Sequence, residues 1–131
     1  MRSTECALQG GSVSELNRAS FQRTLNFIRN HPLGGRHQVR AISNWISWQL
    51  RSRIQPGSHI VSFVGDTKLQ VHRGMHGATG SIYCGLHEFE DMAFVLHFLR
   101  PSDLFIDIGA NVGTYTVLAS GACGARTISV E

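Results

Sequence analysis

Five residues near the end of the chain have the types and spacing of a nucleoside-cofactor site: Asp107, Gly109, Asn111, Gly113 and Glu131. Asp107 lies in a short apolar run, and the glycines after it lack a Cβ, so the backbone of this turn can approach a ligand closely. The helix expected after the turn has unpaired N–H groups that suit a carboxylate. Asp107 beside them attracts an ammonium group, directly or through water. Together these features match the zwitterionic amino-acid end of S-adenosylmethionine.

Glu131 follows Asp107 by 24 residues and comes at the end of the next predicted strand. An acidic side chain at that place accepts hydrogen bonds from the two ribose hydroxyls of an adenosine cofactor. Two alternatives remain open: a dinucleotide fingerprint, and a structural turn without a ligand. The fingerprint G-x-G-x-x-G fits less well, because Asp107 takes the place of its first glycine, where a carboxylate repels a diphosphate. Gly113 also comes one residue late for it.

The surrounding pattern predicts the elements that position this turn. Leu104–Ile108 has the apolar character of a strand covered on both faces, and Thr114–Ser120 is expected to form a helix. Arg126–Val130 reads as a second strand because it is rich in β-branched residues. Strand, glycine turn, helix and strand make a βαβ unit, for which a parallel sheet with a right-handed crossover is expected.

Two segments of the chain carry a family resemblance. Ile82–Asp91 (IYCGLHEFED) and Phe105–Thr116 (FIDIGANVGTYT) resemble the FkbM family of methyltransferases, whose signature is similar to the run D-h-G-A-N-h-G, with h apolar, in the second segment. The close match covers roughly residues 60–131. The resemblance implies a Rossmann-like class I fold with S-adenosylmethionine as cofactor. It also implies methyl transfer to a hydroxyl oxygen of a small molecule, a sugar or a lipid-linked glycan.

The resemblance can be carried over residue by residue. The residues that would line the methionine end of the cofactor are Asp107, Gly109, Ala110, Asn111 and Gly113, and Glu131 would bind the ribose. Tyr83, Glu88 and Thr114 are further candidates for cofactor contacts.

The expected fold class is α/β, as an incomplete Rossmann-like class I methyltransferase fold that holds the first βαβ unit only. A helical N-terminal region (residues 1–57) and a β-hairpin precede that unit, and the cofactor-binding domain covers residues 58–131. A class I methyltransferase sheet has several further strands that carry the adenine pocket and most of the substrate site. We therefore expect the chain to be the N-terminal part of a longer enzyme, or a truncated product, without catalysis on its own.

The helical region is predicted as two helices separated by a breaker at Asn30–Gly35. Ser12 and Glu15 have capping-box spacing for the first helix, which extends to about Arg29. The second helix ends before Gln55–Gly57. Its apolar stripe, expected to pack on the core and widened by Trp45 and Trp48, consists of Val39, Ile42, Ile46, Leu50 and Ile54.

Four elements are predicted between these helices and the turn. Residues 60–73 form a hairpin that turns at Gly65-Asp66, residues 74–80 form a glycine-rich loop, and residues 81–84 form a short strand or extended segment. Phe89–Leu99 is apolar on most sides, which predicts a largely buried helix that ends at Arg100-Pro101.

The catalytic base is left open. A hydroxyl acceptor needs a base near it, and His87 and His97 qualify by residue type, although both positions also suit structural histidines. We expect no metal site. His72 and His76 are four residues apart, but a hairpin and a loop do not bring such a pair to one face, and no cluster resembles a structural zinc set.

Composition limits the class of protein. The 131 residues are 42% hydrophobic with a mean hydropathy of −0.05, and no apolar run is long enough to span a membrane. The N-terminus has no apolar run of the kind that a secretory signal needs. Three cysteines, an odd number and widely spaced, do not describe a disulfide framework. We therefore expect a cytoplasmic protein.

Positive charge is concentrated in the first part of the chain. Residues 1–55 hold eight Arg and two Glu, a net charge of +6, whereas residues 56–131 have a net charge of −3. The alternative function is therefore a non-catalytic domain that binds nucleic acid or an anionic surface through Arg40, Arg51 and Arg53. Solvated faces of ordinary helices explain the same charges. The expected partner thus remains a small-molecule or glycan hydroxyl acceptor rather than a nucleic acid.

Overall fold

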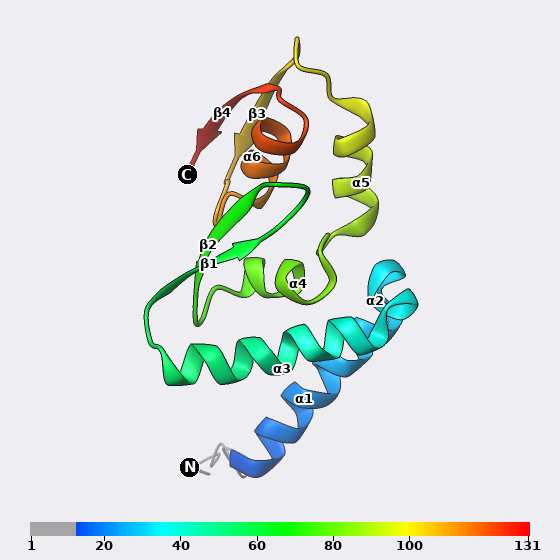
Figure 1. Cartoon of the computed structure of the whole chain (residues 1–131), viewed down its shortest axis with the longest axis vertical. Coiled ribbons are helices and arrows are strands. Elements are labelled where there is room, and N and C mark those ends of the chain that lie inside the picture. The colour runs from blue at the N-terminus through cyan, green and yellow to red at the C-terminus, as the bar shows by residue number, and fades with distance from the viewer. Residues whose placement is uncertain (1–12) are drawn as a thin grey trace, which may run out of the picture.

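The computed structural model describes residues 13–131, which form a mixed α/β arrangement of helices and two small sheets (Figure 1). The helices are α1 (Val13–Asn30), α2 (Pro32–Arg36), α3 (Gln38–Ile54), α4 (His76–Cys84), α5 (Phe89–Phe98) and α6 (Thr114–Val117), which continues into the π-helical turn η1 (Leu118–Ala122). The strands are β1 (Ser58–Ser62), β2 (Lys68–His72), β3 (Leu104–Ile108) and β4 (Arg126–Val130). Over residues 13–131, no helix has both the length and the apolar character that crossing a membrane requires.

The two long N-terminal helices are confirmed as α1 and α3. They cross at one end of the molecule, where α4 lies between α3 and the β1–β2 hairpin, and α5, β3, α6 and β4 occupy the other end (Figure 1). Ser12 and the side chain of Glu15, expected to cap the first helix, lie outside the described residues. The prediction of that capping box therefore stays a prediction.

A capped helical turn fills the segment that was predicted as a breaker. α2 begins at Pro32, whose fixed φ suits the first turn of a helix. His31 Nδ1 accepts hydrogen bonds from the N–H groups of Leu33 and Gly34 at 3.2 and 3.3 Å. The other ring nitrogen, Nε2, donates to the Leu86 carbonyl oxygen at 2.5 Å. The buried imidazole therefore satisfies the backbone of α2 and connects it to the segment after α4.

Helix α3 buries the two tryptophans that widen the predicted stripe, but the prediction was wrong for most of the aliphatic residues of that stripe. Val39 and Ile54 are 86% and 76% exposed. The buried residues of α3 are Ala41, Trp45, Trp48 and Ser52. Because a tryptophan ring buries far more area than an aliphatic side chain, the face that carries both tryptophans packs on the core.

The predicted hairpin is confirmed. β1 and β2 pair antiparallel, with Val61 opposite Leu69. Leu69 and Val71 point inward and are 2% and 1% exposed, while their neighbours along β2 are exposed. This alternation places one face of the hairpin on α3 and α4.

The segment 74–84, predicted as a loop followed by a strand, contains the helix α4. The prediction was wrong because it took the glycines as signals of a loop. A Cβ at Gly80 would overlap the His87 ring, and one at Gly77 would lie 3.0 Å from Asn111 Nδ2. These glycines therefore serve close packing, and tertiary contacts hold a helix whose intrinsic propensity is weak.

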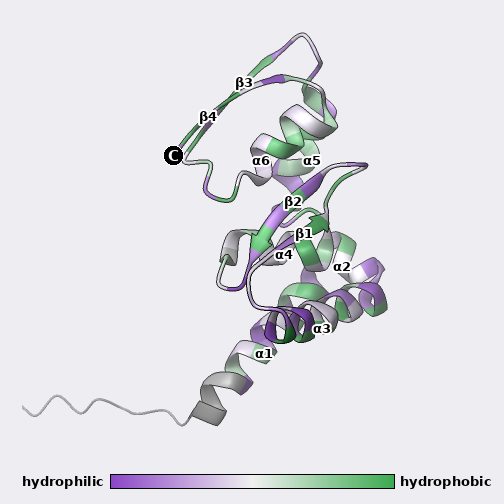
Figure 2. Ribbon diagram, turned by 60° about the vertical axis from the view of Figure 1, so that its left-hand side comes forward, coloured by the Kyte–Doolittle hydropathy of each residue, from purple (hydrophilic) through white to green (hydrophobic). Residues whose placement is uncertain are grey.

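β3 and β4 confirm the predicted strands and pair parallel, with Asp107 opposite Ser129. β3 was expected to be covered on both faces, and this was wrong for the described chain. α6 and η1 cover one face only, as Figure 2 shows. The opposite face, which we call the open face, consists of Leu104, Ile106, Ile108, Ile128 and Val130, all about half exposed or more. Helix α5 is likewise less buried than predicted, because Phe94 and Phe98 are exposed and stack on each other.

Two hydrophobic clusters hold these elements together. The larger one joins side chains of α1 and α3, such as Ile28 and Trp45, to Val71 of β2 and Ala78 of α4. The smaller one joins Met92 of α5 to residues of η1 and of the segment after α4. Because the larger cluster contains side chains from both sides of residue 57, the division into domains 1–57 and 58–131 stays a prediction about folding units.

We predict that Gly34→Ala lowers the free energy of unfolding by about 1–3 kcal/mol. A Cβ at this buried position would overlap the Ile28 carbonyl oxygen and lie 2.9 Å from Cys84 Sγ. Urea denaturation measures the change, with Arg36→Ala, an exposed position in the same helix, as the control. Equal stability of the two variants would show that α2 does not pack as closely as described.

Candidate functional site

The glycine turn, residues 109–113, follows β3 at the carboxyl edge of the parallel sheet. The N–H groups of Gly109 and Ala110 both donate to the Val130 carbonyl oxygen, at 2.7 and 3.2 Å. The end of β4 therefore holds the start of the turn. In open α/β sheets this edge is where ligands bind.

The backbone of the turn needs residues that tolerate a positive φ. Gly109, Asn111 and Gly113 have φ values of 74°, 51° and 73°. Glycine adopts such angles without cost, and asparagine is among the few other residues that do so readily. A Cβ on Gly109 would meet no atom within 4 Å. The turn therefore presents bare backbone to open space at Gly109, which is the property that close approach of a ligand requires.

Glu131 lies at the turn, as its spacing from Asp107 predicted. One of its carboxylate oxygens, Oε2, accepts a hydrogen bond from the Asn111 N–H at 2.6 Å. Both residues are exposed. The carboxylate and the open backbone of the turn thus form one polar surface at the ends of β3 and β4.

Asp107 lies on the opposite face of β3 from the open face and is only 9% exposed. Thr116 Oγ1 donates a hydrogen bond to its Oδ2 atom at 2.5 Å. This bond uses one carboxylate oxygen and connects β3 to the first turn of α6. The aspartate therefore positions the turn relative to the helix, in addition to any charge that it offers to a ligand.

Helix α4 supports the turn from the other side. Gly77 lies next to the Asn111 side chain and also faces Val112, whose Cγ2 atom would be 3.6 Å from a Cβ at Gly77. Thr114, at the start of α6, is 8% exposed. The predicted cofactor residues from Asp107 to Thr114 therefore lie together at one corner of the molecule, with Asp107 and Thr114 buried and Gly109 and Asn111 exposed.

The two other candidates for cofactor contacts, Tyr83 and Glu88, lie in different environments. Tyr83 is buried on α4 and has a hydrogen bond with Gln49 of α3. Glu88 Oε2 accepts a hydrogen bond from the Tyr115 hydroxyl at 2.7 Å, so it contacts the helix that follows the turn. Tyr83 therefore belongs to the helical core, whereas Glu88 lies near the candidate site.

The two histidines considered as bases differ in burial. His87 packs its ring against Phe27, with 5.2 Å between ring centroids, and its buried Nδ1 atom has no hydrogen-bond partner among the described residues. His97 is exposed near the end of α5. Within the described residues, His, Cys, Asp and Glu side chains form no group of three that could hold a metal ion. The side chain of His76, half of the pair weighed for metal binding, lies outside the description.

The sequence assigned no role to Tyr115 or Thr116. Their hydroxyl groups donate hydrogen bonds to the carboxylates of Glu88 and Asp107, respectively. Their signal was the run of hydroxyl side chains directly after the turn, Thr114–Thr116. The first turn of a helix after a strand can direct such groups back to the carboxylate at the strand's end.

We predict that Thr116→Val lowers the free energy of unfolding by about 1–3 kcal/mol, because it leaves the buried Asp107 carboxylate without this donor. Thermal unfolding followed by circular dichroism measures the loss. Ser120→Ala is the control, since its exposed hydroxyl in η1 donates only to a backbone carbonyl. A loss that is no larger for Thr116→Val than for Ser120→Ala would mean that the bond does not stabilise the turn.

The chain has two tyrosines, and both have a raised pKa. Burial is the largest cause at each. The hydrogen bond and charge of Glu88 raise the pKa of Tyr115 further, whereas the Gln49 bond partly lowers that of Tyr83. Because the folded pKa lies above the unfolded one, the protonated phenols contribute their full stabilisation below the unfolded pKa. That contribution is lost as the pH rises through the folded pKa.

We therefore predict that tyrosinate absorbance appears in the folded chain only above pH 10.0, the ordinary pKa of the side chain. The same titration in concentrated urea is the control, and its transition should lie near pH 10.0. Coincident transitions in the two solvents would show that neither phenol is protected by the fold.

Comparisons with protein-family models, with curated proteins and with solved structures found no match for this chain. The resemblance to the FkbM family therefore rests on the residues of segments 82–91 and 105–116 alone. What the chain does must be argued from the geometry of the turn and of the surfaces around it.

Proposed function

We propose that this chain belongs to an S-adenosylmethionine-dependent methyltransferase with a Rossmann-like class I fold, similar to the FkbM family. One observation carries the proposal: a glycine turn with open backbone joins parallel strands β3 and β4 through a helix, and Glu131 lies at that turn. The methyl acceptor is a hydroxyl on a small molecule, a sugar or a glycan.

The arrangement of the sheet supports a larger Rossmann-like fold. β3, the turn, α6 with η1, and β4 follow one another as a βαβ unit with parallel pairing. The open face is apolar, although α6 and η1 cover the other side. In doubly wound sheets, helices cover both faces. We propose that further β–α units cover the open face in the complete enzyme.

The described residues fit S-adenosylmethionine in two respects. The backbone at Gly109 faces open space, so the methionine end of the cofactor can approach it. In the proposal, the neighbouring residues Ala110, Asn111 and Gly113 line the same end of the cofactor. The Glu131 carboxylate lies beside them with one oxygen bonded to Asn111, and its charge suits ribose hydroxyls. When bound, this cofactor supplies an activated methyl group on a sulfonium.

The chain's own residues position the glycine turn and do not transfer a proton. Asp107 and Thr116 hold the turn against α6, and Val130 holds it against β4. Alignment of donor and acceptor is the larger contribution to an in-line methyl transfer, because the thioether leaves without protonation. Cys84 and Cys123 are free thiols, which supports a reducing, cytoplasmic location for the enzyme.

We expect the chain to bind S-adenosylmethionine, and Gly109→Ala to weaken that binding at least about tenfold, or about 1.4 kcal/mol. The added methyl group occupies the space that the cofactor needs, and it disfavours the φ of 74°. Isothermal titration calorimetry measures both affinities. Gly65→Ala is the matched control, because Gly65 also has a positive φ and open space but lies in the β1–β2 turn.

A second variant tests the ribose contact. Glu131→Gln should also weaken S-adenosylmethionine binding, whereas Glu90→Gln on the exposed surface of α5 should not. Equal affinities for Gly109→Ala and Gly65→Ala would refute the site. Binding of a nicotinamide dinucleotide in place of S-adenosylmethionine would refute the cofactor.

A further inference from the structure

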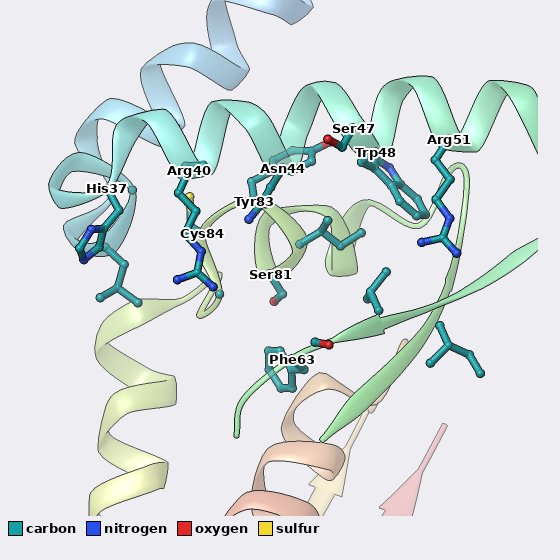
Figure 3. A pocket seen from close by; sticks show the side chains of 18 residues that line it. His37, Arg40, Asn44, Ser47, Trp48, Arg51, Phe63, Ser81, Tyr83 and Cys84 are labelled. Carbon is teal, nitrogen blue, oxygen red and sulfur yellow. The ribbon is translucent and has the colours of Figure 1, made fainter. Parts of the chain in front are cut away.

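A hollow of about 650 Å³ lies away from the glycine turn, between α3 and β1, with α4 as its floor (Figure 3). We call it the α3–β1 cleft. Its volume is within the range of small-molecule sites, about 300–1,000 Å³. Its lining comes from segments that are far apart in the sequence, so packing of α3 against the hairpin creates it.

One wall of the cleft is cationic. Arg40 and Arg51 line it from α3, and Figure 3 shows both side chains extending from the helix toward β1. Eleven residues separate them, which is about three helical turns and roughly 16 Å. They therefore lie on the same side of α3, one toward each end of the cleft, and Asn44 and Ser47 continue the polar stripe between them.

The positive charge of this wall is not balanced within the cleft. None of the described residues that line it is acidic. Each guanidinium group carries a positive charge and offers a planar set of donors that matches a phosphate or a carboxylate. The low-dielectric walls strengthen the resulting positive potential. The cleft is therefore suited to an anion.

The floor of the cleft contains a hydroxyl group without a partner. Ser81 is 4% exposed, and its Oγ atom has no hydrogen-bond partner among the described residues. A serine inside a helix usually bonds to the carbonyl group four residues earlier. Instead, the Ser81 hydroxyl points into the space between α4 and Phe63 (Figure 3). A buried hydroxyl left unpaired costs about 1–3 kcal/mol, and a polar ligand in the cleft would remove that cost.

The remaining walls are apolar. Ile60 and Phe63 line the cleft from the β1 side, and Ile82 lines it from α4. Ile60 is 66% exposed, although it lies on a strand beside the core. A ligand that fills the cleft therefore needs an apolar body as well as a negative group.

We propose that the α3–β1 cleft binds a small organic anion, whose phosphate or carboxylate lies in the positive potential of Arg40 and Arg51 and whose apolar body covers Ile60 and Phe63. The Ser81 hydroxyl donates a hydrogen bond to the ligand. This site is independent of the cofactor site proposed for the glycine turn. In this proposal, Arg40 and Arg51 of α3 bind a small molecule rather than a nucleic acid.

Isothermal titration calorimetry with decyl phosphate, below its micelle concentration, tests the proposal. We expect decyl phosphate to bind and inorganic phosphate to bind more weakly. Decyltrimethylammonium, which has the same alkyl group with the opposite charge, should not bind. Arg40→Gln and Arg51→Gln should each weaken decyl phosphate binding at least about tenfold. Arg53→Gln is the matched control, since Arg53 is exposed on the same helix but does not line the cleft.

Ser81→Ala separates a ligand contact from a structural role. Removal of the unpaired hydroxyl should leave the melting temperature of the free chain unchanged or higher, while the affinity for decyl phosphate falls. A lower melting temperature with unchanged affinity would overturn the role of Ser81.

Three outcomes would overturn the proposal as a whole. The first is no binding of decyl phosphate, and the second is equally tight binding of decyltrimethylammonium. The third is an equal loss of affinity in Arg53→Gln and in the two cleft variants. Binding of a DNA oligonucleotide without binding of decyl phosphate would assign the arginines to the alternative function.

Discussion

The close packing of α4 is the contact on which both candidate sites depend. A Cβ at Gly80 would overlap the His87 ring, and a Cβ at Gly77 would lie only 3.0 Å from Asn111 Nδ2. The same short helix carries Ser81 at the floor of the α3–β1 cleft. One helix of nine residues therefore supports the glycine turn on one side and closes the cleft on the other. The lack of a Cβ atom at Gly77 and at Gly80 permits this close packing on both sides of α4.

The two sites differ in the groups that they present. The glycine turn presents backbone and the carboxylate of Glu131, whereas the Asp107 carboxylate is buried and bonded to Thr116. The cleft presents the guanidinium groups of Arg40 and Arg51, with no described acidic side chain in its lining. The charge asymmetry of the chain, +6 before residue 56 and −3 after it, thus corresponds to two surfaces that suit ligands of different charge. A cationic sulfonium cofactor suits the first surface and an organic anion the second.

Local patterns predicted most of the helices and strands. The apolar stripe of α3, the hairpin pattern of residues 60–73, the apolar run of β3 and the β-branched residues of β4 all identify elements that the structure contains. These signals succeed because each depends on neighbours along the chain. They failed for α4, where glycine is a loop signal by propensity but a packing residue in the structure. They also failed for part of α3, where the two tryptophans are buried but Val39, Ile46, Leu50 and Ile54 are about half exposed or more.

The sequence alone specifies the glycine turn: its residues tolerate a positive φ, a strand precedes it, and an acidic residue comes after the following strand. It does not specify the partners of these residues. The bond from the Asn111 N–H to Glu131, the bond from Thr116 to Asp107 and the unpaired Ser81 hydroxyl arise from packing. Each of these features depends on the distance between segments that come together only when the chain folds. The residue type at one position does not determine that distance.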